Sequence, residues 1–83
     1  MSQTTFGIII ETAVGLSCGM VEGETGAKEP ELFASHYIAK QELLEAVEEG
    51  MDVDGWRVEP ITVNGDFVTL ANSGVAFNWK VGV

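Results

Sequence analysis

The sequence predicts an α+β fold, in which one α-helix packs on one face of a four- to five-stranded, mostly antiparallel sheet. Three observations support this class. Residues 5–14 are rich in β-branched side chains, residues 35–50 follow a helical period, and residues 57–83 contain strand patterns separated by turns. The predicted order of elements is β-β-α-β-β-β. A chain of 83 residues is long enough for a single small globular domain spanning residues 1–83.

The first two predicted strands occupy residues 5–14 and 16–21. Three consecutive isoleucines, at positions 8–10, make the first strand apolar on both faces, which is typical of a central strand. Gly15 separates the two strands. Residues 22–30 are rich in glycine and charge, so a loop is expected there.

The segment 35–50 is predicted to be the helix. Ser35 suits the N-cap, and Gly50 suits the position just beyond the C-terminus. At about 100° per residue, several side chains gather on one face. This predicted sheet-facing side consists of His36, Lys40, Leu43, Leu44, Val47 and Met51. Residues 31–34 form either the first helical turn or a short extended piece.

The C-terminal third contains the strongest turn signal. Asn64-Gly65 lies between the strand patterns 57–63 and 66–71, and this dipeptide favours a tight hairpin turn with positive φ at both positions. A second turn is expected at residues 72–74. The segment therefore predicts a β-meander.

The last predicted strand, residues 75–83, alternates regularly between two faces. Its apolar face comprises Val75, Phe77, Trp79, Val81 and Val83. Such alternation indicates an antiparallel strand with one face exposed to water. Pro60 has no N–H group, so the strand at residues 57–63 is expected to be an edge strand or to contain a bulge.

Charge restricts the function more than any motif does. Thirteen acidic residues against four basic ones give a formal charge of −9. This charge repels nucleic acids and anionic lipids and attracts cationic partners, so we expect no direct nucleic-acid binding and no membrane association. A hydrophobic content of 46% and a mean hydropathy of +0.19 indicate a folded chain despite the charge.

The N-terminus and the single cysteine favour a cytoplasmic location. The apolar run from Phe6 to Ile10 is too short for a signal peptide or a membrane span. Cys18 has no second cysteine with which to form an internal disulfide.

No pattern of reactive side chains predicts catalysis, a metal site or a cofactor. Asp52-Val53-Asp54-Gly55 resembles the start of a calcium-binding loop, but its glycine comes too early. A zinc site lacks ligands. Nothing in the spacing brings Cys18 and His36 together as a nucleophile and its base. We therefore expect a protein that is not an enzyme.

The candidate partner-binding residues are six acids within thirteen positions. They are Glu42, Glu45, Glu48, Glu49, Asp52 and Asp54. They form either a solvated surface that keeps the domain soluble or an acidic ridge that binds a basic groove on another protein. Few neighbouring lysines or arginines compensate them, which favours the second interpretation. Trp56 is either a core residue or an exposed aromatic anchor in a protein interface.

In size, in this acidic helix and in the compact meander around Asn64-Gly65, the chain resembles the small acidic inhibitors that phages produce against bacterial defences. These are the anti-CRISPR and anti-restriction proteins. The resemblance covers overall character rather than matched residues. It implies a stoichiometric inhibitor, active in the host bacterial cytoplasm, that blocks the nucleic-acid-binding surface of a CRISPR effector complex, in the manner of a DNA mimic.

The alternative hypothesis is a small homo-oligomeric structural or adaptor protein, such as a virion assembly component. An edge strand beside Pro60 or at the C-terminus would then pair between two chains in a homodimer.

Overall fold

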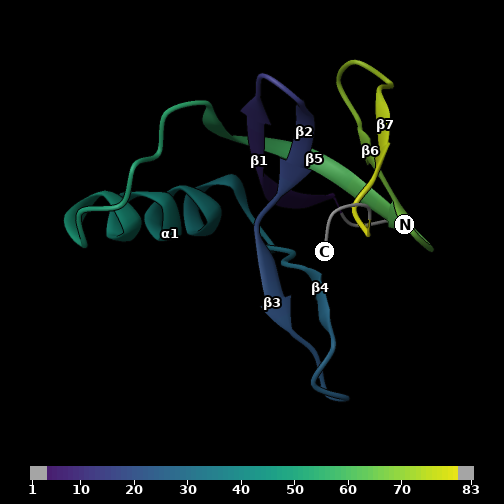
Figure 1. Ribbon diagram of the computed structural model, residues 1–83, viewed down its shortest axis with the longest axis horizontal. Helices are drawn as coiled ribbons and strands as arrows, with labels where there is room; N and C mark the ends of the chain where they lie inside the picture. The colour runs from purple at the N-terminus through teal and green to yellow at the C-terminus, as the bar shows by residue number, and fades with distance from the viewer. Residues whose placement is uncertain (1–3, 81–83) are drawn as a thin grey trace.

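The computed structural model describes residues 4–80 and shows an α+β protein (Figure 1). In this part of the chain, four strands precede one helix and three strands follow it. The elements are β1 (Thr5–Thr12), β2 (Gly15–Cys18), β3 (Met20–Glu22), β4 (Lys28–Pro30), α1 (His36–Glu48), β5 (Trp56–Asn64), β6 (Phe67–Leu70) and β7 (Ala76–Asn78). The order therefore has two more strands before the helix than the sequence predicted.

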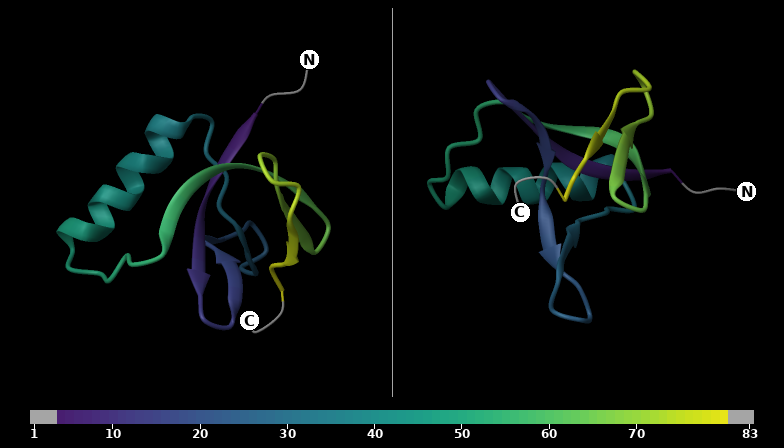
Figure 2. Two further views of the ribbon diagram at one scale, coloured as in Figure 1. Left: turned by 90° about the horizontal axis from the view of Figure 1, so that it is seen from above. Right: turned by 45° about the vertical axis from the view of Figure 1, so that its right-hand side comes forward.

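Five strands form one antiparallel sheet in the order β2-β1-β5-β6-β7. The helix packs against β1 and β5. The remaining strands, β3 and β4, pair with each other in a hairpin that projects from the body of the molecule (Figures 1 and 2).

The central strand β1 is buried on both faces, as its isoleucines predict. Ile8 packs with Phe33 and Ala39 in a cluster on the helix side. Ile9 belongs to a second cluster on the opposite face, which contains the fully buried Ile61 and Val68. The sheet thus separates two hydrophobic cores.

The sheet curves strongly, so that its two edge strands approach each other. Leu16 and Ser17 of β2 line one groove together with Phe77 and Asn78 of β7. Within residues 4–80, β2 and β7 are not hydrogen-bonded to each other and remain the two edges of the sheet. The structure therefore resembles a five-stranded barrel that has not closed.

The helix begins and ends where the sequence predicts. The Ser35 side chain accepts a hydrogen bond from the backbone N–H of Ile38 at 3.2 Å, which caps the N-terminus. Gly50, just beyond the helix, has a φ of 85°, which favours glycine.

The predicted sheet-facing side of the helix is wrong in part. Ala39 and Ala46 are the buried residues of the helix, whereas Leu44 is 44% exposed and Val47 is 47% exposed. Small side chains at these two positions let the helix lie close to β1 and β5. Leu44 and Val47 are therefore left on the outer flank, whereas Leu43 packs against the helix-side cluster.

The hairpin predicted at Asn64-Gly65 is present, with its turn shifted by one residue. Asn64 pairs with Phe67, so Gly65 and Asp66 are the two turn residues. Only Gly65 has a positive φ, of 61°, which fits a type II′ turn and not a type I′ turn.

The strand containing Pro60 was expected to be an edge strand or to contain a bulge, and both alternatives are wrong. β5 lies between β1 and β6, and its register with β1 is unbroken at Pro60. Pro60 is opposite Phe6, whose backbone N–H and C=O both bond to Phe33 and so face away from β5. The backbone nitrogen of Pro60 therefore lies on the side of β5 that faces Ala71, just past the end of β6. The missing N–H costs the β1–β5 pairing no hydrogen bond, and it falls where the β5–β6 ladder ends.

Two other segments differ from expectation. Residues 22–30 were expected to be a loop, but Lys28–Pro30 forms β4 and completes a hairpin with β3. The last strand, β7, spans three residues; Phe77 and Trp79 pack against the core as predicted, whereas Val75 is 46% exposed. The predicted continuation to Val81 and Val83 lies outside the described residues. Over residues 4–80, no helix is long and apolar enough to cross a membrane.

Candidate functional site

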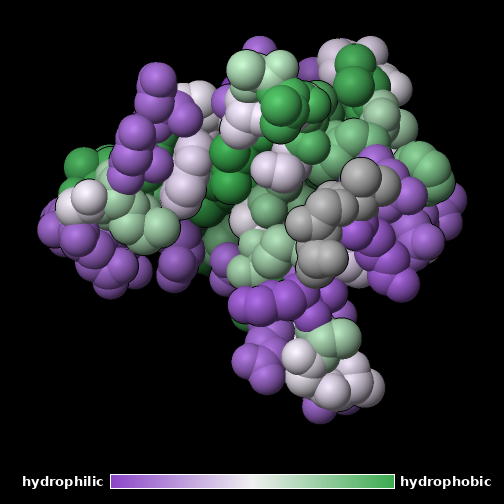
Figure 3. Space-filling model, viewed as in Figure 1, coloured by the Kyte–Doolittle hydropathy of each residue, from purple (hydrophilic) through white to green (hydrophobic). Residues whose placement is uncertain are grey.

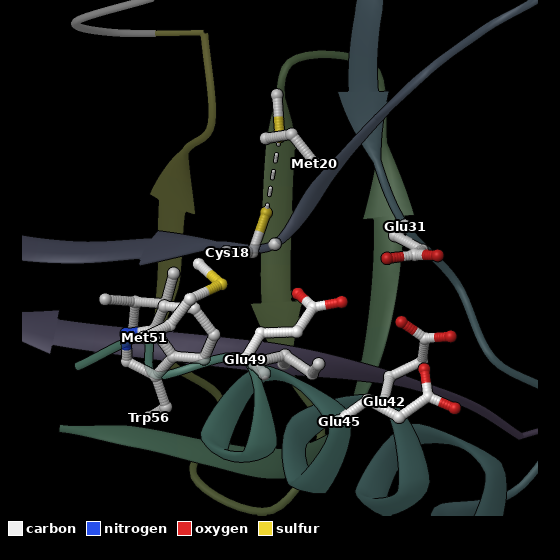
Figure 4. A pocket seen from close by; sticks show the side chains of 12 residues that line it. Cys18, Met20, Glu31, Glu42, Glu45, Glu49, Met51 and Trp56 are labelled. Atoms are coloured by element: carbon white, nitrogen blue, oxygen red, sulfur yellow. Dashed lines mark hydrogen bonds between the residues drawn. The ribbon is translucent and has the colours of Figure 1, made fainter. Parts of the chain in front are cut away.

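A groove of about 370 Å³ separates α1 from β1 and from the β2–β3 connection. Four carboxylates line it, and we term it the acidic groove: Glu31, Glu42, Glu45 and Glu49. Glu31 lies on the segment between β4 and α1, and its carboxylate faces those of the helix (Figure 4). In the space-filling view, the hollow between helix and strands has hydrophobic residues at its floor (Figure 3).

The helical repeat explains why three of the four carboxylates share the groove. Glu42, Glu45 and Glu49 are three and four positions apart, so they lie on one flank of the helix. The neighbouring flank carries Ala39 and Ala46, which face the sheet. The acidic stripe therefore lies beside the sheet-facing side, and not opposite to it.

Glu31 is placed in the groove by its backbone. Its N–H donates to the carbonyl of Gly19 at 3.0 Å, and two residues later Phe33 forms a bridge with Phe6 on β1. The segment that the sequence left undecided is therefore extended. Sequence reasoning missed Glu31 because only the fold brings this segment against the helix.

The electrostatics of the groove are those of uncompensated carboxylates. Partial burial raises the pKa of Glu31 above its ordinary value, and repulsion by Glu42 raises it further. Ion pairs form elsewhere: Arg57 pairs with Glu11 and Glu59, and Lys80 pairs with Asp66. Within residues 4–80, no ion pair involves a carboxylate of the groove.

The apolar part of the groove lining is rich in sulfur. It includes Ile8 and Ile10 from β1 together with Cys18, Met20 and Met51. The thiol of Cys18 lies 3.8 Å from the thioether sulfur of Met20. Burial raises the pKa of the Cys18 thiol above its ordinary value, which favours the protonated thiol in the free protein.

The other predicted acidic residues lie outside the groove. Glu48 is exposed on a different flank of the helix. Asp52 accepts a hydrogen bond from the backbone N–H of Asp54 at 3.0 Å, which stabilises the exposed turn after the helix. The six predicted residues are thus divided into three that line the groove and three that do not.

Trp56 also lines the groove, and it is partly buried. It packs against the helix-side cluster of Ile8, Phe33 and Ala39. Trp56 therefore contacts the helix-side core and also borders the groove.

Cys18 and His36 occupy different environments. His36 packs edge-on against Phe6, with ring centroids 6.0 Å apart, and it lines a separate cavity with Lys40 and Trp56. Between residues 4 and 80, no three His, Cys, Asp or Glu side chains gather in a way that would hold a metal ion.

Comparisons with family models, with curated proteins and with solved structures found no match to this chain.

Proposed function

We propose that this chain is a non-enzymatic binding protein whose acidic groove accepts cationic side chains from the nucleic-acid-binding surface of a partner protein. By occupying that surface, the chain acts as an inhibitor. The resemblance to phage-encoded acidic inhibitors gives the class of partner, a bacterial defence complex such as a CRISPR effector.

The absence of cations from the groove is the observation that carries this proposal. Four carboxylates share one groove, and none of them is paired within the described chain. Mutual repulsion of this kind is unfavourable for the isolated protein. A partner that supplies lysine or arginine side chains removes the repulsion and forms charge-assisted hydrogen bonds.

The shape of the groove supports the same class of partner. Its apolar floor suits the aliphatic part of a lysine or arginine side chain, and the carboxylates suit the charged end. Trp56 adds an aromatic ring, which interacts favourably with a guanidinium group.

The position of the acids along the helix is also unfavourable for the helix itself. Glu48 and Glu49 lie at its C-terminal end, and α1 has no acidic residue in its first turn and no basic residue in its last turn. The helix dipole prefers the reverse arrangement by about 0.3–1 kcal/mol per charge. The charge distribution therefore does not serve to stabilise the helix.

The proposal is tested by competition with nucleic acid. The tagged chain is used to retrieve a partner from a bacterial lysate, and the partner is then purified. The purified partner, bound to labelled nucleic acid, is titrated with this chain at several salt concentrations. We expect displacement of the nucleic acid, and we expect the affinity to fall steeply as salt rises.

Two charge-matched variants locate the binding surface. The triple variant Glu42→Lys, Glu45→Lys and Glu49→Lys reverses the groove. The control triple variant Glu48→Lys, Asp52→Lys and Asp54→Lys reverses the same number of charges outside it. We expect the groove variant to lose displacement and the control to retain most of it. Equal losses would show that only net charge matters and would refute the groove as the site.

Self-association is a second candidate function, because the groove between β2 and β7 leaves two strand edges without a partner in the described chain. An extended segment of another copy would fit between such edges. Light scattering during size-exclusion chromatography tests this. A dimer supports the adaptor hypothesis, and a strict monomer at high concentration removes it.

A further inference from the structure

Three sulfur-containing side chains line the acidic groove: Cys18 and Met20, which are two positions apart, and Met51 from a distant part of the sequence. Cys18 ends β2, Met20 begins β3, and Met51 follows α1. We term these residues the sulfur cluster. In the view of Figure 4, the Cys18 sulfur lies between those of Met20 and Met51.

The geometry of the first pair suits a bound ion. The sulfurs of Cys18 and Met20 are 3.8 Å apart. Metal–sulfur bonds are about 2.3 Å long, so one ion bonded to both sulfurs would form an S–metal–S angle of roughly 110°. This angle lies between the angles of trigonal and tetrahedral coordination.

Met51 is able to supply the third ligand. Its side chain is 50% exposed and follows the helix in an irregular segment. Methionine has three rotatable side-chain bonds, so its sulfur adjusts its position easily. The indole ring of Trp56 lines the same part of the groove and provides a π face for a cation.

We propose that the sulfur cluster binds a soft monovalent cation of the Cu(I) class. One thiolate and two thioethers are the ligands that such ions prefer, whereas zinc, calcium and magnesium prefer nitrogen, oxygen or several thiolates. The surrounding carboxylates raise the local concentration of cations at the site.

Binding is a simple exchange of a proton for a metal ion. The ion displaces the proton of the Cys18 thiol, one sulfur–metal bond forms there, and one proton passes to the buffer. Each thioether donates a lone pair and keeps its neutral charge. No atom changes its oxidation state.

This site is distinct in its ligands from the proposed partner-binding function. Docking of a basic protein depends on the carboxylates, whereas the ion depends on the sulfurs. Each proposal can therefore be refuted without refuting the other.

The test is a calorimetric titration of the whole chain with Ag(I) in a chloride-free nitrate buffer, because Ag(I) is a redox-inert probe of this class. We expect one ion to bind per chain, with release of one proton and a change in tryptophan fluorescence. Zn(II), added in equal concentration, should not displace it.

The thioethers decide between the cluster and a solitary thiol. Met20→Leu and Met51→Leu keep the side-chain volume and the thiol, so the fold is preserved. Removing a group that only supports a metal ligand typically weakens metal binding by about 10- to 100-fold. Removing a ligand itself should cost at least as much, so we expect each variant to lose at least about tenfold in affinity. Cys18→Ser should lose the tight site altogether.

A relocated thioether provides the matched control. The double variant Met51→Leu and Leu44→Met keeps the number of sulfurs but moves one to the exposed flank of the helix. Its affinity should equal that of Met51→Leu alone. Wild-type affinity in both single methionine variants would overturn the proposal, because Cys18 alone would then account for the binding.

Discussion

Glu31 and Glu42 face each other across the acidic groove, and the charge of Glu42 helps to raise the pKa of Glu31. The two residues belong to segments that meet only in the folded chain. The fold therefore brings two negative charges close together. Within residues 4–80, neither carboxylate forms an ion pair with a lysine or arginine.

Glu31→Gln should stabilise the protein at neutral pH. The folded-state pKa of Glu31 is raised above the ordinary value of 4.5, so the folded protein binds this proton more tightly than the unfolded chain does. Stability is therefore greatest below the unfolded pKa and is lost as the pH rises through the folded pKa. A gain of roughly 0.2–0.5 kcal/mol is expected, the size of a repulsive pair of exposed charges.

Urea unfolding at two pH values measures this effect. The gain from Glu31→Gln should be present at neutral pH and absent below the unfolded pKa, where both states are protonated. Glu24→Gln, at the exposed tip of the β3–β4 hairpin, is the control for a general loss of charge. A gain that persisted in acid would contradict the pKa argument.

Gly55→Ala should destabilise the protein more than Gly74→Ala does. Both glycines have a positive φ, of 82° and 76°, so alanine is strained at either position. A Cβ atom at Gly74 would meet open space, but at Gly55 it would overlap the backbone carbonyl oxygen of Glu11. We expect about 1 kcal/mol for Gly74→Ala and more than about 3 kcal/mol for Gly55→Ala, because strain and overlap add.

Thermal or denaturant unfolding of the two variants separates these contributions. Similar losses of stability would show that backbone strain alone matters and that β1 moves freely away from residue 55.

Local chemistry made part of this fold predictable. Ser35 and Gly50 bound the helix as expected, because a capping hydroxyl and a positive φ depend on a few neighbouring residues. The hairpin at residues 64–65 was predictable for the same reason. Its turn moved by one residue because the pairing of Asn64 with Phe67 is set by the whole β5–β6 register.

Contacts between distant segments explain what the sequence did not predict. Pro60 is tolerated in an interior strand because β6 has already ended at the point where the Pro60 N–H would have donated. Only the register of the strands reveals this. Glu31 joins the groove through a hydrogen bond to Gly19. The sequence predicted Glu42, Glu45 and Glu49 as partner-binding residues but gave no sign of the strands that face them.

Ser35→Ala should destabilise the protein by about 1 kcal/mol, because it removes the acceptor for the N–H of Ile38. Ser35→Asp should retain stability or increase it, since a carboxylate both caps the helix and interacts favourably with its dipole. Denaturant unfolding checks both variants. Equal stability of the alanine variant and the wild type would mean that water replaces the hydroxyl without loss.

Two adjacent leucines test which flank of the helix faces the sheet. Helical periodicity assigned Leu43 and Leu44 to the same buried side, but only Leu43 packs against the cluster of Ile8, Phe33 and Ala39. Leu44 is 44% exposed. Both leucines have the same helix propensity, so the two alanine variants differ only in the contacts that they lose.

Leu43→Ala should therefore lower the free energy of unfolding by about 1.5–3 kcal/mol, through lost burial and the cavity left behind. Leu44→Ala should lower it by less than about 0.5 kcal/mol, as is usual for an exposed position. Urea denaturation followed by circular dichroism measures both. If Leu44→Ala cost more stability than Leu43→Ala, the helix would be rotated, with Leu44 against the sheet. The flank that carries Glu42, Glu45 and Glu49 would then turn away from Glu31, and the acidic groove would not exist in solution.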